Sequence, residues 1–358
     1  MEYRVSENEH QIDLPKRIVV GKGILERAGS YFTEVFGKRG LGVLVVTGPN
    51  VKTSLYPVLK QALEDEGLSV WDAVVSEASL DVAMSVLQEI DSSIDVIIGF
   101  GGGKSIDVAK YSAKLSKRPF VSVPTTTSHD GIASPYASLK GFERPLSKPA
   151  KPPDLIMVDL EAVLRAPRRY NVAGFGDLVG KLTAVRDWRL ASLLKGEYYG
   201  EYSATISLTS AKHAMNKYRE LANNTVEGFK VLVEGLISSG IAMCIAGSSR
   251  PASGSEHLIA HAISLVSKNP PLHGEAVAVG TVIAAGLHGI NWRKIKSVLK
   301  SVGLPTTAKE LGISDEELVE AISIAPTIRP ERYTILGDKQ IDLEVAHKLA
   351  ARMEVIEV

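Results

Sequence analysis

The sequence has very little cysteine, few aromatic residues and no excess of charge of either sign. Its single cysteine, Cys244, cannot form an intramolecular disulfide, which fits a reducing compartment. The 41 basic residues balance the 41 acidic ones, so the net field offers no general attraction for nucleic acid or for a membrane surface. Any anion-binding site must therefore be built locally.

Long uninterrupted hydrophobic runs are absent as well. The first twenty residues mix charged and polar side chains and so lack the apolar core of a signal peptide. The most apolar stretches lie near residues 231–246 and 276–287. The first is interrupted by Glu234, Ser238 and Ser239, and the second is too short to cross a bilayer. We therefore expect a cytoplasmic protein without membrane insertion.

The sequence does have an ordinary globular composition, with 45% hydrophobic and 23% charged residues. Its 358 residues are too many for one compact core and indicate two domains. The hydrophobic pattern changes near residue 160, so we place the domains at 1–160 and 161–358. A cleft between two such domains is the natural place for a site.

Short β-branched runs alternate with amphipathic stretches in the first domain. The expected strands and helices are, in order, 41–47, 54–66 (helix), 68–75, 80–90 (helix), 95–100, 104–115 (helix), 120–123 and 154–159. Near-continuous apolar strands alternating with helices indicate a doubly wound, Rossmann-like α/β domain with a parallel sheet. Residues 131–153 break this alternation and indicate an irregular excursion or a hairpin.

The second domain has long helical periodicity and is predicted to be all-α. Its main expected helices cover 177–194, 201–217, 224–246, 256–266 and 273–288, and short helices follow from Trp292.

Three successive glycines follow a predicted strand in Gly99-Phe-Gly-Gly-Gly-Lys-Ser-Ile-Asp107. Glycine lets the backbone approach a phosphate, and the next helix adds its N-terminal N–H groups and dipole. Ile98 stands where a Walker A loop needs its first glycine, and Lys104 replaces the third glycine of the usual dinucleotide fingerprint. A plain tight turn is the alternative, but we predict a cradle for a diphosphate.

A second loop, Pro124-Thr-Thr-Thr-Ser-His-Asp-Gly131, gathers four hydroxyls, a histidine and an acid after the next predicted strand. Ligands of open α/β sheets bind at the carboxyl ends of the strands. The loop could instead cap the following segment, but its place beside the glycine loop favours cofactor binding.

Two histidines, His257 and His261, lie four residues apart and so share one helical face. A pair at this spacing is more often structural. However, His273 follows within sixteen residues of His257, and Asp177 supplies a carboxylate in Gly174-Phe-Gly-Asp-Leu-Val-Gly-Lys181. Imidazole nitrogens with one carboxylate suit zinc or ferrous iron, and three protein ligands leave a position open for substrate. We therefore predict a metal centre.

Together these motifs resemble the family that includes the iron-containing alcohol dehydrogenases, glycerol dehydrogenase and glycerol-1-phosphate dehydrogenase. The resemblance extends from about Leu14 to about Asp338. The segments 183–188, 247–257 and 328–336 are most similar to the archaeal branch that acts on a phosphorylated substrate. The resemblance implies a dinucleotide-binding domain over 1–160, a metal- and substrate-binding domain over 161–358, and a site in the cleft.

The resemblance also implies a role for each site residue. One zinc ion per chain, or iron, would be held by Asp177, His257 and His273. Asp130, Asp177 and His261 would contact the substrate and act in catalysis. The cofactor, NAD or NADP, would be bound by Gly102, Gly103, Lys104, Ser105, Ile106, Asp107, Thr125, Thr126, Thr127, Ser128 and Ser134.

The implied reaction is the reversible reduction of dihydroxyacetone phosphate to sn-glycerol 1-phosphate, the backbone of archaeal ether phospholipids. The metal would act as a Lewis acid on the ketone oxygen. His261, or a water relayed through it, is our candidate proton donor. Lys181 and Arg250, close in sequence to predicted ligands, are the candidate partners of the substrate phosphate. The family also implies a homo-oligomer.

The choice between NAD and NADP is predicted from the absence of an acidic residue after one strand. Dinucleotide sites restricted to NAD usually carry an acid after the second strand of the mononucleotide fold. The equivalent place here reads Gly48-Pro49-Asn50. Because no carboxylate stands there to repel a 2′-phosphate, we expect both NAD and NADP to be used, with Lys52 as a candidate partner of that phosphate.

Three other functions fit parts of the pattern. A 3-dehydroquinate synthase-like cyclase shares the fold, but its ligand segment resembles Ala-Glu-x-x-Lys, where this chain has Gly176-Asp-Leu-Val-Gly-Lys181. A glycerol or alcohol dehydrogenase would differ in using an unphosphorylated substrate. A non-catalytic nucleotide-binding protein would leave the metal residues without a use.

Overall fold

The computed structural model describes residues 9–37, 40–141 and 146–357. The chain divides into two compact units, Met1–Arg168 and Arg169–Val358. The boundary expected near residue 160 falls within the first unit, where helix α6 (Leu160–Arg165) begins.

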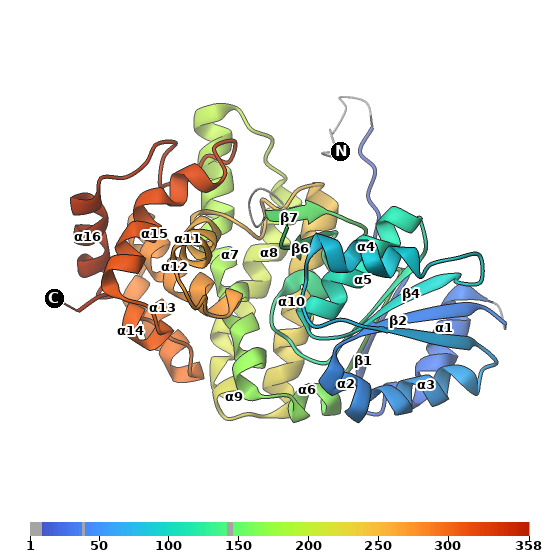
Figure 1. The fold of residues 1–358 in the computed structure, drawn as a ribbon. Helices are drawn as coiled ribbons and strands as arrows, with labels where there is room; N and C mark the ends of the chain where they lie inside the picture. The colour runs from blue at the N-terminus through green and yellow to red at the C-terminus, as the bar shows by residue number, and fades with distance from the viewer. Residues whose placement is uncertain (1–8, 38–39, 142–145, 358) are drawn as a thin grey trace. The chain divides into compact units, whose positions relative to one another are not determined.

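The first unit is built on a six-stranded sheet (Figure 1). Its strands are β1 (Arg17–Gly21), β2 (Gly42–Thr47), β3 (Ser69–Val74), β4 (Val96–Gly101), β5 (Phe120–Pro124) and β8 (Leu155–Asp159). They lie in the order β1-β8-β5-β4-β2-β3, and each neighbouring pair is parallel. The predicted parallel sheet is confirmed. Edge strand β1, which the sequence pattern did not predict, pairs with β8.

Each face of this sheet is covered by helices. Side chains alternate along β2, so that Val43 and Val45 join one buried core while Leu44 and Val46 join the other. The first core includes η1 (Leu25–Arg27), α1 (Ala28–Phe36) and α3 (Tyr56–Glu64), and the second includes α4 (Leu80–Gln88) and α5 (Gly103–Ser116). The unit is therefore doubly wound, as predicted.

Two local features differ from the simplest expectation. The helix predicted over 54–66 is observed as α3, and a further short helix that was not predicted, α2 (Pro49–Ser54), precedes it. Pro57 separates the two helices, because it has no N–H to continue the hydrogen-bond ladder. Residues 131–153 contain the hairpin that was one of the two expectations, with β6 (Tyr136–Leu139) antiparallel to β7 (Leu146–Pro149). Residues 142–145, which were part of that expectation, lie outside the described residues.

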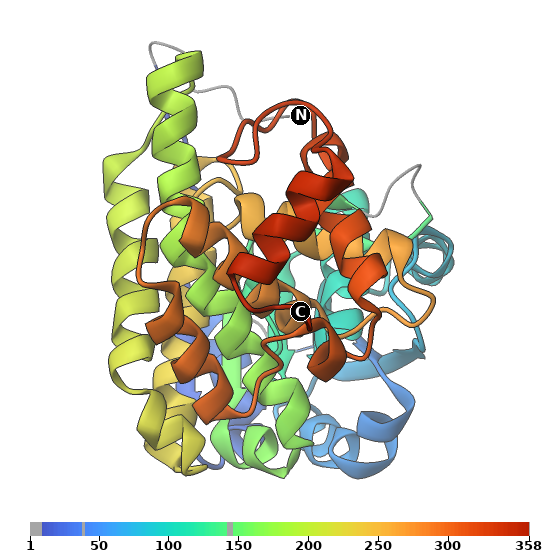
Figure 2. The same cartoon turned by 90° about the vertical axis from the view of Figure 1, so that its left-hand side faces the viewer.

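The second unit is helical throughout its described length, as predicted (Figure 2). Its helices are α7 (Arg168–Lys195), α8 (Glu201–Asn216), α9 (Tyr218–Ala222), α10 (Val226–Ala246), α11 (Ser255–Val266), α12 (His273–Leu287), α13 (Trp292–Val302), α14 (Ala308–Leu311), α15 (Asp315–Ile328) and α16 (Leu343–Arg352). Helix α7 begins nine residues before the predicted start at Asp177.

Helix α10 is the one described helix long and apolar enough to cross a membrane by length and composition. However, 72% of its most apolar window is buried inside the protein, as in the core helix of a globular unit.

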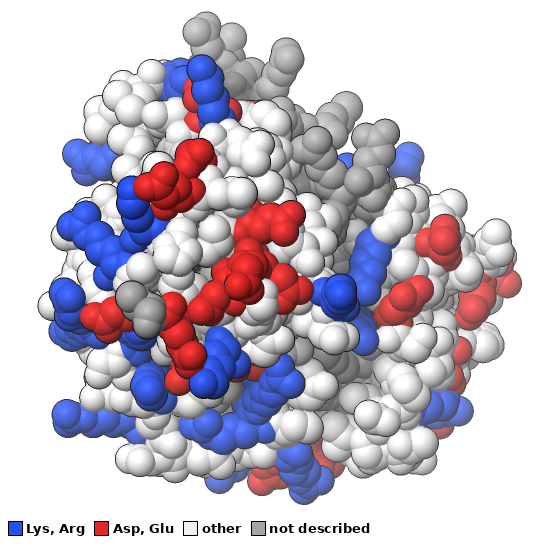
Figure 3. Space-filling view, turned by 60° about the vertical axis from the view of Figure 1, so that its left-hand side comes forward, with Lys and Arg blue, Asp and Glu red and all other residues white. Residues whose placement is uncertain are grey.

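Figure 3 shows groups of acidic and basic side chains beside one another on the face it presents, in keeping with the equal numbers of the two signs.

Candidate active site

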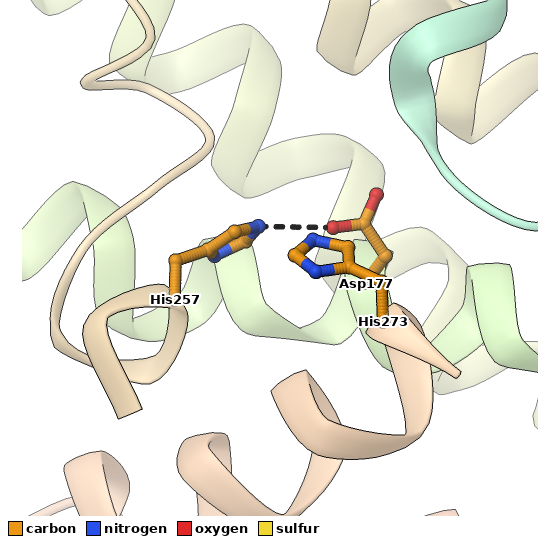
Figure 4. A group of neighbouring side chains, drawn as sticks. All are labelled: Asp177, His257 and His273. Atoms are coloured by element: carbon orange, nitrogen blue, oxygen red, sulfur yellow. Dashed lines mark ion pairs between the residues drawn. The ribbon is translucent and has the colours of Figure 1, made fainter. Parts of the chain in front are cut away.

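The three predicted metal ligands come together in the helical unit. Asp177 lies on α7, His257 on α11, and His273 is the first residue of α12. One ligand atom from each lies within 4.8 Å of the others, and Nε2 of His257 is 3.2 Å from Oδ1 of Asp177. Figure 4 shows the three side chains pointing toward a common point. Asp177 and His257 are buried, and His273 is half-buried.

Close backbone contact between α7 and α12 makes this convergence possible. A Cβ on Gly274 would lie 1.8 Å from the carbonyl oxygen of Ala173, and one on Gly176 would lie 2.2 Å from that of Gly274. Glycine is therefore required at the crossing, directly beside Asp177 and His273. Glycine inside a helix also lowers helix propensity, which is why the sequence pattern placed the start of α7 too late.

An ion pair fastens the start of α12. The Arg169 guanidinium donates two hydrogen bonds to the carboxylate of Glu275, at 2.6 and 2.8 Å. Glu275 also accepts from the backbone N–H of Leu272 at 3.1 Å. The Glu275 of the His273-Gly-Glu275 motif thus orients the helix end that carries His273.

Glu256, adjacent to His257, orients that imidazole. Its fully buried carboxylate lies 2.8 Å from Nδ1 of His257 and also accepts from the Gly254 N–H at 2.6 Å and the Thr183 hydroxyl at 2.7 Å. An ionised carboxylate only accepts, so Nδ1 carries a hydrogen. In the neutral ring, the lone pair is then on Nε2, which faces Asp177. Sequence reasoning missed Glu256, although its place next to a predicted ligand was a signal.

The charge of Asp177 is stabilised by its neighbours. Burial opposes ionisation, but the Lys181 ammonium at 3.0 Å and the nearby imidazole of His257 outweigh it and hold the pKa of the Asp177 carboxyl well below its usual range. Lys181 is fully buried. The structure therefore places this candidate phosphate partner against the ligand carboxylate.

The chemistry of this donor set fits a divalent metal ion. A carboxylate held ionised and two imidazoles, converging from three helices, match the ligand types of zinc and of non-haem iron sites. The hydrogen bond from His257 to Glu256 is the second contact that metal-binding histidines usually make. The predicted ligands are thus brought together by the fold.

His261 lies beside these ligands, one turn along α11. Its ring centroid is 5.7 Å from that of His273 and 6.4 Å from that of His257. Burial lowers the pKa of His261 well below its usual range, and the imidazoles of His273 and His257 add to the effect when they are protonated. The imidazole is therefore neutral at physiological pH.

In the first unit, the glycine and hydroxyl loops meet at the carboxyl edge of the sheet. Strand order reverses between β2 and β4, and such a switch point is where open α/β sheets bind ligands. Gly101, at φ +143°, ends β4 in a conformation that favours glycine. Its carbonyl accepts from the Thr125 N–H at 2.9 Å, and the Thr126 hydroxyl lies over Gly102.

The predicted cofactor residues differ in exposure. Gly102 is the N-cap of α5, and Gly103, Lys104 and Ser105 form its first turn, whose N–H groups have no acceptor within the helix. Thr126 and Ser128 are half-buried, and so is Asp130, which was predicted to contact the substrate. The remaining members have buried side chains, namely Ser105, Ile106, Asp107, Thr125, Thr127 and Ser134. The Lys104 ammonium donates to the Ser76 carbonyl at 3.1 Å.

His129 links the two loops. Its Nδ1 accepts from the Gly131 N–H at 2.9 Å, and its ring occupies the space that a Cβ on Gly103 would need. Burial raises the pKa of Asp107, which lies nearby on α5, although positive charge at Lys110 and His129 opposes that effect. The start of α5 is thus held against the hydroxyl loop.

Comparison with known proteins agrees with this geometry. A family model described as iron-containing alcohol dehydrogenase matches residues 19–167. The glycerol-1-phosphate dehydrogenase (NAD(P)+) of Aeropyrum pernix is 56% identical over 348 residues, which cover 97% of this chain and 99% of that protein. The glycerol-1-phosphate dehydrogenase (NAD(P)+) of Sulfurisphaera tokodaii is 49% identical, and the match covers 98% of this chain and 99% of that protein. The chain belongs to the glycerol-1-phosphate dehydrogenase family.

The fold of this glycerol-1-phosphate dehydrogenase family member is shared with other solved structures. Glycerol dehydrogenase from Schizosaccharomyces pombe superposes with a TM-score of 0.77 at 23% identity and covers 97% of this chain and 90% of its own. An NADH-dependent butanol dehydrogenase A from Thermotoga maritima has a TM-score of 0.73 at 16% identity, covering 98% and 99%. The predicted family and fold are confirmed.

Two cations singled out in the sequence have structural partners in this family member. Lys52 is ion-paired with Asp72 of β3, and the Tyr56 hydroxyl donates to the same carboxylate at 2.9 Å. Asp72 comes from the strand next to β2, so its proximity to Lys52 was not visible in the sequence. Arg250 is nearly fully buried and is ion-paired with Glu197. The structure thus gives Lys52 and Arg250 partners within the protein.

A buried carboxylate that the sequence reading passed over joins three segments of the helical unit. Asp187 on α7 accepts from the N–H and hydroxyl of Ser255, each at 2.6 Å. It also accepts from the Ile335 N–H at 2.7 Å and lies 2.9 Å from Nε2 of His288. Asp187 therefore fixes the start of α11, two residues before His257.

Proposed function

We propose that this chain is an NAD(P)H-dependent, metal-assisted enzyme that reversibly reduces dihydroxyacetone phosphate to sn-glycerol 1-phosphate for the backbone of ether phospholipids. The observation that carries the proposal is the convergence of Asp177, His257 and His273 in a chain 56% identical to a glycerol-1-phosphate dehydrogenase. The first unit is the dinucleotide-binding domain, and the second binds metal and substrate.

Asp177, His257 and His273 hold one divalent ion, and we favour zinc over iron. The bound ion supplies Lewis acidity toward the ketone oxygen. Three protein ligands leave a coordination position for substrate oxygen. Lys181 keeps Asp177 ionised, and Glu256 and Glu275 fix the orientation of His257 and of the helix end at His273.

The cofactor diphosphate lies at the N-terminus of α5, where Gly102, Gly103, Lys104 and Ser105 present backbone N–H groups. Thr125, Thr126, Thr127 and Ser128, with Ser134, line the nicotinamide side, and Ile106 and Asp107 support the turn from within. The bound NADH or NADPH supplies the hydride.

Asp130 and His261 are the remaining substrate contacts. Because the imidazole of His261 is neutral, it can accept a hydrogen on one ring nitrogen while it donates from the other. We therefore assign His261 to relay a proton between water and the substrate oxygen rather than to store one.

We also place the enzyme in the cytoplasm as a homo-oligomer. Cys244 is buried and is the single cysteine of the sequence, so it forms no intramolecular disulfide, which fits a reducing compartment. Measurement of the molar mass in solution, for example by light scattering, tests the assembly.

A steady-state assay with two ketones and two cofactors tests the function. We expect turnover of dihydroxyacetone phosphate with NADH and with NADPH, and far lower efficiency on dihydroxyacetone. Equal efficiency on the two ketones would instead indicate a glycerol dehydrogenase. Absence of net cofactor oxidation would indicate a cyclase or a binding protein.

A further inference from the structure

One fully buried carboxylate joins the three helices that carry the predicted metal ligands. Asp187 lies on α7, about three turns after Asp177. Its Oδ2 accepts from the N–H and the hydroxyl of Ser255, each at 2.6 Å, at the start of α11. Its Oδ1 lies 2.9 Å from Nε2 of His288, the C-cap of α12. The three helices therefore meet at Asp187 as well as at the ligands in Figure 4.

Asp187 caps the N-terminus of α11 from the neighbouring helix. The N-cap residue of α11 is Gly254, which has no side chain to accept from the N–H groups of the first turn. The Asp187 carboxylate accepts from one of these groups, at a position where the helix dipole also favours a carboxylate. A Cβ on Gly254 would lie 2.5 Å from Oδ2 of Asp187, so this close approach requires glycine. The start of α11 is thus set by α7.

Helices α7 and α12 are held against each other at two separate points. The close approach of Gly176 and Gly274 lies beside the ligands. The contact between Asp187 and His288 lies at the C-terminal end of α12. Between these points, a Cβ on Gly180 would lie 2.9 Å from a side-chain carbon of α12. Because the packing is this close along the whole contact, α12 cannot slide along α7 without losing its bond to Asp187.

The surroundings of Asp187 suit a carboxylate and not an amide. A carboxylate only accepts hydrogen bonds, so Nε2 of His288 carries a hydrogen. Oδ1 also accepts from the Ile335 N–H at 2.7 Å, and Oδ2 accepts from the Ser255 N–H. Each oxygen therefore faces a backbone donor. In either orientation, the NH2 group of an asparagine would face one of these N–H groups and leave it without an acceptor.

We propose that Asp187 is a positioning residue of the metal centre, which fixes the register of α7, α11 and α12 and thereby the convergence of the three ligands. Each ligand comes from a different helix, so a shift of one helix along another changes the distances between the ligand atoms. A bound zinc ion accepts only a narrow range of ligand distances. The proposal deepens the proposed function and rests on it.

Asp187→Asn tests this role through metal binding. Competition between the zinc-loaded protein and a chromophoric chelator should show a zinc affinity about tenfold lower than that of wild type, the low end of the loss for groups that orient metal ligands. Cobalt(II) added to the zinc-depleted variant should give a visible absorption spectrum different from that of cobalt-loaded wild type, because this spectrum reports the geometry of the ligands. Both measurements are made well below the Tm of the variant.

Asp159, in the first unit, offers a matched control. It is also a buried carboxylate that accepts from backbone N–H groups, including those of Ile24 and Leu25 at 2.7 and 3.1 Å. Asp159→Asn should lower the Tm, as Asp187→Asn does, but should leave zinc affinity and the cobalt spectrum unchanged. If the two variants change zinc affinity equally, the effect of Asp187 is a general loss of stability and the proposal is wrong.

A second pair of variants decides the question if Asp187→Asn does not fold. His288→Gln keeps an N–H donor at the end of the side chain, whereas His288→Leu removes it. The leucine variant should bind zinc more weakly than wild type, and the glutamine variant should recover part of the affinity. Wild-type zinc affinity in His288→Leu would show that α12 is not held through Asp187, and would overturn the proposal.

The possible results separate the two proposals. Lower zinc affinity with a changed cobalt spectrum in Asp187→Asn, but not in Asp159→Asn, supports the positioning role. If the wild type binds zinc and Asp187→Asn keeps its affinity and spectrum, the positioning role is wrong and the proposed function stands. If the wild type binds neither zinc nor cobalt, the metal centre of the proposed function is wrong, and the positioning role fails with it.

Discussion

Glu256 accepts a hydrogen bond from Nδ1 of its neighbour His257 at 2.8 Å, and this bond determines which ring nitrogen faces Asp177. Replacing Glu256 by Gln keeps the shape but removes the charge. We expect zinc affinity to fall about 10- to 100-fold, as for other carboxylates that orient a metal-binding histidine. Competition with a chromophoric chelator measures this without an activity assay. Glu234→Gln, at an exposed position of α10, is the control, and equal zinc affinities in both variants would contradict the role of Glu256.

Removal of a ligand should be more severe than removal of its orienting partner. In His257→Ala, two ligands remain and cannot hold the tetrahedral geometry. We expect loss of bound zinc, measured by elemental analysis, together with loss of activity. His213→Ala, on an exposed position of α8, should keep both. Prolonged chelation of the wild type should likewise abolish activity, and added zinc should restore it.

Cofactor use should respond to the pair formed by Lys52 and Asp72. We expect the wild type to use NADH and NADPH, with less than about a thousandfold preference, or about 4 kcal/mol. Asp72→Asn should raise kcat/KM with NADPH relative to NADH several-fold, because it removes a negative charge and leaves Lys52 for a 2′-phosphate. Tyr56→Phe removes a hydrogen bond to Asp72 without a change of charge and serves as the control. If the ratio of kcat/KM with NADPH to kcat/KM with NADH is unchanged in Asp72→Asn, the 2′ position of the cofactor ribose does not lie near Asp72.

Asp154 should make the stability of the first unit depend on pH. Burial opposes its charge, but hydrogen bonds from Lys151 and from the Phe120 N–H, with Lys16 nearby, hold its pKa below the usual range. A lowered carboxyl pKa stabilises the fold above the ordinary value of about 4, and this stabilisation is lost as the pH falls through the lowered pKa.

Asp154→Asn should therefore lower the free energy of unfolding at pH 7 by about 1 kcal/mol, the difference between charged and neutral hydrogen bonds. The difference from wild type should shrink as the pH is lowered below about 4. Urea unfolding at several pH values measures it, with exposed Asp13→Asn as the control. A difference independent of pH would show that charge is not its cause.

The crossing of α7 and α12 should not tolerate a side chain at Gly274. A Cβ there would meet the backbone oxygen of Ala173, which cannot move without displacing α7. We expect Gly274→Ala to cost about 3 kcal/mol of stability and to lower zinc affinity, because Asp177 and His273 flank the crossing. In Gly286→Ala the new Cβ would meet the flexible side chain of Met353, so this control should cost much less. Equal costs would contradict the argument.

Much of the first unit could be predicted from sequence, because each strand of a doubly wound sheet is a continuous apolar run followed by an amphipathic helix. β2, β4 and β5 fall within a residue or two of their expected bounds. β1 was not predicted, because Arg17–Gly21 is short and half-exposed and pairs with β8, which lies far along the chain. A local pattern contains no information about such a distant partner.

The candidate site divides in the same way. The residue types and spacing of His257, His261 and His273 predicted a metal site, because few other kinds of site bring several histidines together in this way. The sequence alone therefore determined the family and the ligands that we expected. Only the tertiary structure assigned the charged neighbours: it placed Lys181 on Asp177 and brought Arg332 to the loop before α11. Lysine and arginine side chains are long and flexible, so each pairs with whichever opposite charge lies near it in space. Which distant segments lie near one another is decided by how the helices pack.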